Sequence, residues 1–264
     1  MGRQAFSTYL FAIARAGSIL GLLLAGCGDD SAASDGAADG RLGPDGRPDA
    51  GSLDARGADG APWQHTITID GDVADWIPGG EQFDTTSYGD FFLYLTWDAT
   101  HVYLAVEGDL TIEPASTWFV ACFDADPGAS TGADTGELLG SHRPSFPNGF
   151  GAEHCYKRRL DGASAQLSDW DGASDWVAGA STNAAQGTGF LEVAVPRAGL
   201  GDPAQLGIVA LLMDAVTPER AYAGLYQGSF TDGTQVGTIV PIAYYFAQAF
   251  ATEDPPNDPR HRQP

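Results

Sequence analysis

The stretch "FFLYLTWDATHVYLAVEGD", residues 91–109, decides the fold. Its first part, residues 91–97, has a large apolar side chain at every odd position, and residues 102–106 have one at every even position. Side chains of a β-strand point alternately to its two faces, so each part predicts a strand with one buried face. The intervening "DATH" (98–101) predicts a turn, and the whole stretch is therefore expected to form an antiparallel hairpin.

Similar short apolar runs recur across residues 63–250, separated by turns rich in Gly, Asp and Pro. The further predicted strands are "TITI" (66–69), "TWFVACFD" (117–124), "AEHCYKRR" (152–159), "DWVAGAST" (175–182), "GFLEVAVP" (189–196), "LGIVALLMD" (206–214) and "TIVPIAYYFAQAF" (238–250). Pro241 predicts an edge position or a break in the last run. Only "RAGLGDP" (197–203) predicts a helical turn. This pattern predicts one all-β domain, an antiparallel β-sandwich of the jelly-roll or immunoglobulin-like kind.

The charge of the chain limits its partners. The formal net charge is −22 over 264 residues, and Lys157 is the only lysine. Such an acidic surface repels phosphates, so nucleic acid is not expected as a partner. The many carboxylates are suited to cations such as Ca²⁺.

The N-terminal residues predict a targeting segment. Residues 16–26 form an apolar run of 11 residues, shorter than the roughly 20 that span a bilayer. The run ends in "LLAGC" (23–27), which resembles the lipobox of bacterial lipoproteins. That resemblance implies a signal peptide over residues 1–26, cleavage before Cys27, a lipid on its sulfur, and, since Gly28 follows, a place at the outer membrane or cell surface. An ordinary secretory signal is the alternative.

Both flanks of the domain have compositions that disfavour folding. Residues 27–62 consist mostly of Asp, Gly, Ala and Pro and predict a disordered tether, because they cannot bury enough apolar surface. The recurring "DG" there leaves a Ca²⁺-binding repeat as an alternative, but its spacing is irregular. Residues 251–264 predict a frayed tail.

Several segments together resemble one family. "ITIDGDVADW" (67–76) is similar to the first strand, acidic turn and Trp of the family 9 carbohydrate-binding modules and the DOMON-like sandwiches. Further similar segments follow in order: "LTWDATHVYLAVEGD" (95–109), "ACFDADPGASTGAD" (121–134), "LSDWDGASDWV" (167–177) and "LEVAVPRAGLGDP" (191–203). In this resemblance Ile67 and Ile69 are expected on a buried face, and Trp76 is expected to close the open end of the sandwich as a lid.

The resemblance implies sugar binding, Ca²⁺ binding, haem binding or an accessory role. For sugar, the candidate aromatic residues are Trp118, Trp170 and Trp176, the last two facing each other across a hairpin; packing in the core is the alternative. Haem is not expected, because Met213 lies in an apolar strand and core packing explains it. No catalytic motif is present in the sequence, so an enzyme is not expected.

The cysteines beyond Cys27 predict a disulfide. Cys122 and Cys155 form an even pair in an oxidising compartment, and antiparallel pairing of their strands places them opposite each other. Two buried free thiols are the alternative.

The same register predicts a cation site. It places Asp124 opposite Glu153, and carboxylates so close repel each other unless a proton, an Arg or a metal ion intervenes. Asp126 and Asp134 in the adjoining loop could join them as Ca²⁺ ligands, or these Asp side chains could only cap turns. The register also places Trp118 opposite Arg159, where a cation–π contact is expected.

Together these features predict a surface lipoprotein, held to the membrane by its lipid, that carries a non-catalytic binding module with a glycan as the expected ligand. The alternative is a structural or protein-interaction module of the cell envelope without a small ligand.

Overall fold

A computed structural model describes residues 63–129, 131–139, 142–215, 220–225, 227–232, 239–250 and 262–263. The expected signal peptide, Cys27 and the tether lie outside these residues. The strands are β1 (Gln82–Asp84), β2 (Phe91–Trp97), β3 (His101–Gly108), β4 (Thr117–Asp124), β5 (Arg143–Ser145), β6 (His154–Arg159), β7 (Ala165–Trp170), β8 (Trp176–Ala178), β9 (Asn183–Gly187), β10 (Phe190–Pro196), β11 (Gln205–Asp214), β12 (Arg220–Tyr222), β13 (Ile239–Pro241), β14 (Tyr245–Ala249) and β15 (Arg262–Gln263). The helical segments are η1 (Val73–Asp75), α1 (Pro78–Glu81) and η2 (Arg197–Leu200).

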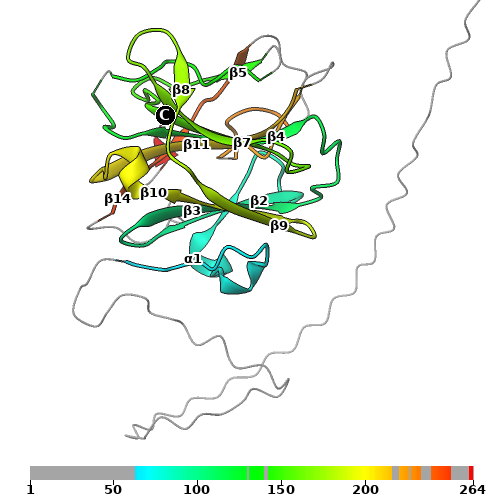
Figure 1. Cartoon of the computed structure of the whole chain (residues 1–264). Helices are drawn as coiled ribbons and strands as arrows, with labels where there is room; N and C mark the ends of the chain where they lie inside the picture. The colour runs from blue at the N-terminus through cyan, green and yellow to red at the C-terminus, as the bar shows by residue number, and fades with distance from the viewer. Residues whose placement is uncertain are drawn as a thin grey trace, which may run out of the picture. The chain divides into compact units, whose positions relative to one another are not determined.

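The strands form two antiparallel sheets that pack face to face, as Figure 1 shows. One sheet has the order β1-β2-β3-β10-β9, and the other has the order β15-β14-β11-β4-β6-β7-β8 with β12 beside β11. A separate parallel pair joins β13 to β5. The predicted all-β sandwich is therefore confirmed.

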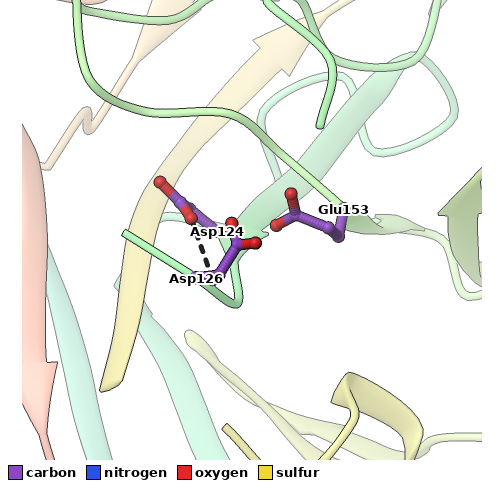
Figure 2. A group of neighbouring side chains, drawn as sticks. All are labelled: Asp124, Asp126 and Glu153. Atoms are coloured by element: carbon purple, nitrogen blue, oxygen red, sulfur yellow. Dashed lines mark hydrogen bonds between the residues drawn. The ribbon is translucent and has the colours of Figure 1, made fainter. Parts of the chain in front are cut away.

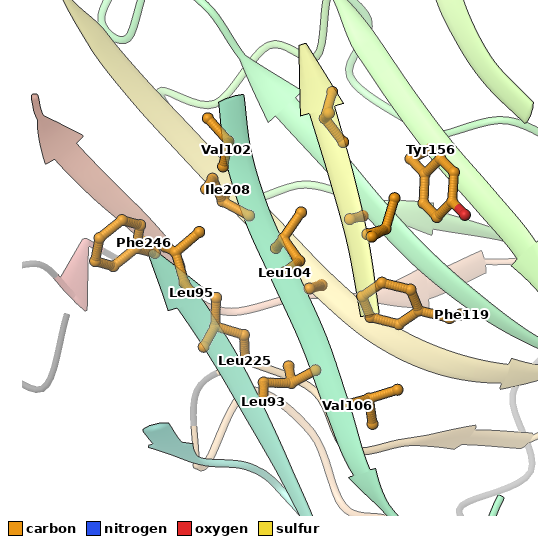
Figure 3. Packing of buried hydrophobic residues seen from close by; sticks show 14 of the residues in the cluster. Leu93, Leu95, Val102, Leu104, Val106, Phe119, Tyr156, Ile208, Leu225 and Phe246 are labelled. Carbon is orange, nitrogen blue, oxygen red and sulfur yellow. The ribbon is translucent and has the colours of Figure 1, made fainter. Parts of the chain in front are cut away.

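The main core lies between the sheets. The odd-numbered apolar residues of β2 and the even-numbered ones of β3 point into it, as the alternation predicts, and meet residues such as Phe119, Tyr156 and Ile208 from the opposite sheet (Figure 3). The predicted hairpin is also confirmed, with Trp97 paired to Val102 at its turn. The carboxylate of Asp98 stabilises that turn, because Oδ1 accepts from the backbone N–H of Thr100 (2.6 Å) and of His101 (2.8 Å).

A second apolar layer covers the outer face of the five-stranded sheet. Ile67 and Trp76 are buried there against Tyr94 and Phe190, and Trp76 meets the Tyr94 ring with centroids 5.5 Å apart. Two expectations need correction. Residues 66–69 form no strand, and Trp76 covers this outer face rather than the open end of the sandwich. Trp76 lies on the outer face because its hydrogen-bond acceptor is there: the side chain of Glu192 in β10 is on that face and accepts from the indole N–H of Trp76.

A third apolar layer covers the outer face of the eight-stranded sheet. Residues 125–152, which link β4 to β6 and include β5, contribute Leu139 and Phe150 to a cluster with Cys122, Cys155 and strand β11. Glu137 of this linking segment fastens it to the sheet, because its carboxylate forms an ion pair with Lys157 and accepts a hydrogen bond of 2.9 Å from Ser168. Asp126 and Asp134 belong to this segment, and Asp124 and Glu153 flank it directly.

The remaining differences from the sequence prediction concern short elements. The run 238–250 is broken after Pro241 into β13 and β14, as the proline predicts. The predicted strand 175–182 is limited to β8. Strands β1, β5, β9 and β12 have too few apolar residues to be predicted by alternation. Of the expected frayed tail, the structure describes β15, which pairs with β14. Among the described residues no helix is long and apolar enough to cross a membrane.

Candidate functional site

Three carboxylates meet at the end of β4. Asp124 ends the strand, Asp126 follows it, and Glu153 precedes β6 (Figure 2). One oxygen from each of the three lies within 4.8 Å of the others. We call Asp124, Asp126 and Glu153 the acidic group.

The disulfide sets the register that brings the acidic group together. Cys122 and Cys155 are bonded and face each other on β4 and β6, with Cα atoms 4.1 Å apart, so the predicted bond is confirmed. One step further, the backbone N–H of Glu153 donates to the carbonyl oxygen of Phe123 at 3.0 Å, which brings Glu153 alongside Asp124 as predicted.

Backbone donors orient these carboxylates. Asp124 accepts from the N–H of Asp126 (3.1 Å) and of Gly151 (3.2 Å), and Glu153 accepts from the N–H of Ala125 (2.8 Å). None of the ion pairs formed within the described part of the chain involves the acidic group. Its negative charge is thus met by amide dipoles and not by a basic side chain.

The Thr131 hydroxyl completes the group. Its oxygen lies 2.7 and 2.8 Å from the two carboxylate oxygens of Asp126 and 3.0 Å from Oε1 of Glu153. A hydroxyl has one proton, so it can donate to only one of these three oxygens at a time. The group therefore has more acceptors than donors, which is an arrangement that suits a cation.

Burial changes the titration of Asp124, which is only 2% exposed. Its pKa is raised to about 6: burial is the largest cause and the charges of Glu153 and Asp126 add to it, while hydrogen bonds from the N–H groups of Gly151 and Asp126 oppose it. Tyr245 nearby is affected as well, because burial and the charge of Asp124 raise the pKa of its phenol. A carboxyl with a pKa of about 6 is largely ionised at neutral pH and gains from a nearby cation.

The acidic group opens into a cavity of about 140 Å³ lined by Asp124, Asp126, Thr131 and the glycine-rich loop around them. Asp134, the fourth predicted ligand, lines the same cavity but does not belong to the group whose oxygens lie within 4.8 Å of one another. The structure therefore brings together three of the four predicted ligands.

Two of the three predicted sugar-binding aromatics form a pair beside the acidic group. Trp170 and Trp176 are directly paired across the β7–β8 hairpin, as expected, with ring centroids 5.5 Å apart and planes inclined by 57°. Both are partly buried. Asp171 holds the turn between them by accepting from three backbone N–H groups, which also lower its pKa. The backbone N–H of Trp170 donates to the backbone carbonyl of Glu153 at 2.7 Å, one position beyond the pair His154–Asp169. Trp170 and Glu153 are therefore opposite each other, so their side chains leave the same face of the sheet.

Trp118 lies apart from this pair. It is opposite Arg159 as predicted, but six residues separate Arg159 from Glu153 along β6, a distance of about 20 Å in a strand. The predicted cation–π contact between Arg159 and Trp118, both described residues, is not formed. The Nε of Arg159 donates to Asp161 at 2.7 Å instead. Among the described residues, the cation–π contact found is that of Arg197 with the Phe250 ring.

Two residues that matter here were not predicted. Thr131 has no pattern of its own in the sequence, and its role follows only from the fold of the loop over β6. Glu192 is fully buried in an apolar strand, and a single charged residue among the six apolar ones of β10 was the signal that could have identified it.

Comparison of the chain with protein-family models, curated proteins and solved structures finds no match.

Proposed function

We propose that this chain is a lipid-anchored surface protein whose sandwich is a non-catalytic, carbohydrate-binding module containing a bound Ca²⁺. The observation that carries the proposal is the position of Trp170 opposite Glu153 on neighbouring strands, because it puts an aromatic pair and a carboxylate cluster side by side on one sheet face. The anchor is inferred from "LLAGC", which ends at Cys27. The absence of catalytic motifs in the sequence favours binding over catalysis.

The aromatic pair supports the carbohydrate. The C–H faces of a sugar ring are apolar, and an indole gives a large, rigid surface for them to contact. The Asp171 turn keeps the rings of Trp170 and Trp176 in place before any ligand arrives, which lowers the entropy cost of binding. The neighbouring carboxylates and amides then provide polar partners for sugar hydroxyls.

The acidic group supports the calcium ion. Oxygens that bind one Ca²⁺ lie about 2.3–2.6 Å from it, and so no more than about 5 Å from one another. One oxygen from each of the three carboxylates meets that limit, and the Thr131 hydroxyl is close to two of the three side chains. In this proposal Asp124, Asp126 and Glu153 hold the ion, which neutralises their charge and fixes the loop beside the ring pair.

A glycan array on the chain that begins at Gly28 tests the carbohydrate. We expect retention of a glycan by the unaltered chain and its loss in the double variant Trp170→Ala, Trp176→Ala. Trp118→Ala is the matched control, because it removes a partly buried Trp about 20 Å away along the sheet. Equal retention by the double variant would place the sugar elsewhere. Binding of no glycan at all would favour the alternative, a structural or protein-interaction module.

Thermal melting in Ca²⁺ and in chelator tests the ion separately. Ca²⁺ that binds only the folded chain stabilises it by about 2.7 kcal/mol at 100 times the dissociation constant. We expect Asp126→Asn and Glu153→Gln to abolish this stabilisation and Asp134→Asn to retain most of it, since Asp134 is outside the group. A melting temperature that Ca²⁺ leaves unchanged, with no metal by elemental analysis, would remove the site.

A further inference from the structure

A second cavity, of about 240 Å³, lies at the end of the β2–β3 hairpin and shares no lining residue with the cavity of the acidic group. Three aromatic residues line it, Trp63, Trp97 and Phe250. Its lining also includes Arg197, Asp98 and Ala204. Strand β2 supplies Trp97 and η2 supplies Arg197, whose own N–H donates to the Thr100 carbonyl in the hairpin turn. The hairpin turn and η2, which a backbone hydrogen bond joins, therefore form one side of the cavity.

Arg197 has unused donors in this cavity. Its NH1 and NH2 groups donate to the carbonyl oxygens of Asp98 and Pro203 over 3.4 and 3.3 Å, and its Nε has no acceptor in the described part of the chain. A guanidinium has five N–H donors, and the two acceptors that the described residues give to this one are both distant. The Asp98 carboxylate does not pair with it, because that carboxylate already accepts from Thr66, Thr100, His101 and Tyr103.

The indole N–H of Trp97 also lacks an acceptor among the described residues. Its Nε1 is buried and has no acceptor among the described residues, whereas the indole N–H of Trp63 donates to the Thr96 hydroxyl at 3.0 Å. A buried donor without an acceptor costs about 1–3 kcal/mol. The Trp97 ring centroid and the Arg197 guanidinium carbon lie 5.4 and 4.4 Å from the centroid of the Phe250 ring, so both side chains pack against one aromatic ring.

We propose that this cavity binds a small organic anion with an apolar body, such as an arylalkyl carboxylate. Its carboxylate pairs with the guanidinium of Arg197, since a planar fork of N–H donors matches the two carboxylate oxygens. Its apolar body lies against the rings of Trp63 and Phe250. The net charge of −22 repels every anion, this ligand included, so binding depends on the local pairing with Arg197 and on the aromatic contacts.

The test is calorimetric titration of the chain that begins at Gly28 with phenylacetate, in about 0.15 M salt to screen the long-range repulsion. We expect saturable binding, and at least about ten-fold weaker binding in Arg197→Gln, equal to about 1.4 kcal/mol. Ala204→Phe fills the cavity from an exposed position, without altering Arg197, and should abolish binding. Ala163→Phe, at an exposed Ala outside the cavity, is the control and should bind normally.

Two reference ligands separate charge from shape. Acetate has the charge without the body, and phenylacetamide has the body without the charge; both should bind at least about ten-fold more weakly than phenylacetate. The proposal is overturned if phenylacetate shows no saturable binding at millimolar concentration, or if Arg197→Gln and Ala204→Phe both bind it normally. Binding of glucose that Ala204→Phe abolishes and Arg197→Gln leaves intact would overturn the anion assignment.

Discussion

The indole Nε1 of Trp76 donates to Oε2 of Glu192 over 3.3 Å, and 116 residues separate the two in the chain. The other oxygen of the same carboxylate accepts from the backbone N–H of Asp70 and of Gly71. Glu192 therefore holds both the acidic turn and the Trp of "IDGDVADW" onto the outer face of the five-stranded sheet. This is how a segment without strand pairing stays fixed to the sandwich.

Replacing Glu192 should release this segment. Glu192→Ala leaves three donors without their charged acceptor, and hydrogen bonds to charged groups contribute about 1.5–3 kcal/mol each. Because such losses are not additive, we expect a loss of about 3–5 kcal/mol in the free energy of unfolding, measured with urea. Trp76→Phe should cost less, since it removes one donor. Asp84→Ala, at an exposed residue of β1, is the control, and a cost as large as that of Glu192→Ala would contradict the prediction.

The turn at Asp70 and Gly71, which Glu192 holds, also requires a glycine at position 71. Its φ is +87°, and an added Cβ would lie 2.6 Å from the backbone nitrogen of Gly187 in β9. Gly71→Ala therefore combines an unfavourable backbone conformation with a clash against another backbone. Gly172→Ala is a matched control, because Gly172 has φ +79° and open space around the new Cβ.

We expect Gly172→Ala to cost about 1–2 kcal/mol, the cost of the left-handed conformation alone. Gly71→Ala should cost clearly more in the same urea titration. Equal costs would mean that the Gly71 turn moves away from β9 without loss, and that its contact with the sheet contributes little to stability.

The disulfide between Cys122 and Cys155 should contribute much of the stability of the sandwich. Cys122 and Cys155 are 33 residues apart, and closing a loop of that length in the unfolded chain is worth about 3–4 kcal/mol by the chain-entropy estimate. We expect reduction to lower the free energy of unfolding by about that amount. The double variant Cys122→Ala, Cys155→Ala should be destabilised at least as much and should not respond to the reductant. A reductant effect that persists in this variant would have another origin.

The parts of the molecule that were predictable from sequence are those fixed by local alternation. The β2–β3 hairpin has a side-chain period of two over its whole length, and burial of one face then follows. The Cys122–Cys155 pairing extended this to tertiary structure, because one fixed pair sets the register of two strands and so brought Asp124 to Glu153. Trp170 and Trp176 could be paired because a short polar turn separates them.

The rest depended on contacts between residues far apart in the chain. "TITI" has strand-forming residues, yet it pairs with no strand among the described residues. The backbone N–H of His65 beside it donates to the carbonyl of Trp97 at the end of β2, and the segment lies across the sheet face. The buried acceptor that decides the place of Trp76 comes from β10. The donors of Trp97 and Arg197 that lack an acceptor among the described residues likewise lie where distant elements meet, at the second cavity.

The acidic group gives the last prediction, a change in the pH dependence of stability. Folding raises the pKa of Asp124 from 3.8 to about 6, chiefly through burial. A carboxyl whose pKa is raised by folding favours the folded state when it is protonated. Its contribution is therefore fully present below about pH 3.8 and is lost as the pH rises through about 6.

In chelator, we expect the stability of the unaltered chain to fall between about pH 4 and pH 7 relative to that of Asp124→Asn, which cannot ionise at this position. Asp134→Asn should keep the dependence of the unaltered chain, since Asp134 lies outside the acidic group. Ca²⁺ binds the ionised carboxylates, so adding it should reverse the trend and make the unaltered chain gain stability as the pH rises through about 6. The measurement is the melting temperature of the three proteins at each pH, with and without Ca²⁺. Parallel curves for the unaltered chain and Asp124→Asn in chelator would show that the burial of this carboxyl leaves its titration unchanged.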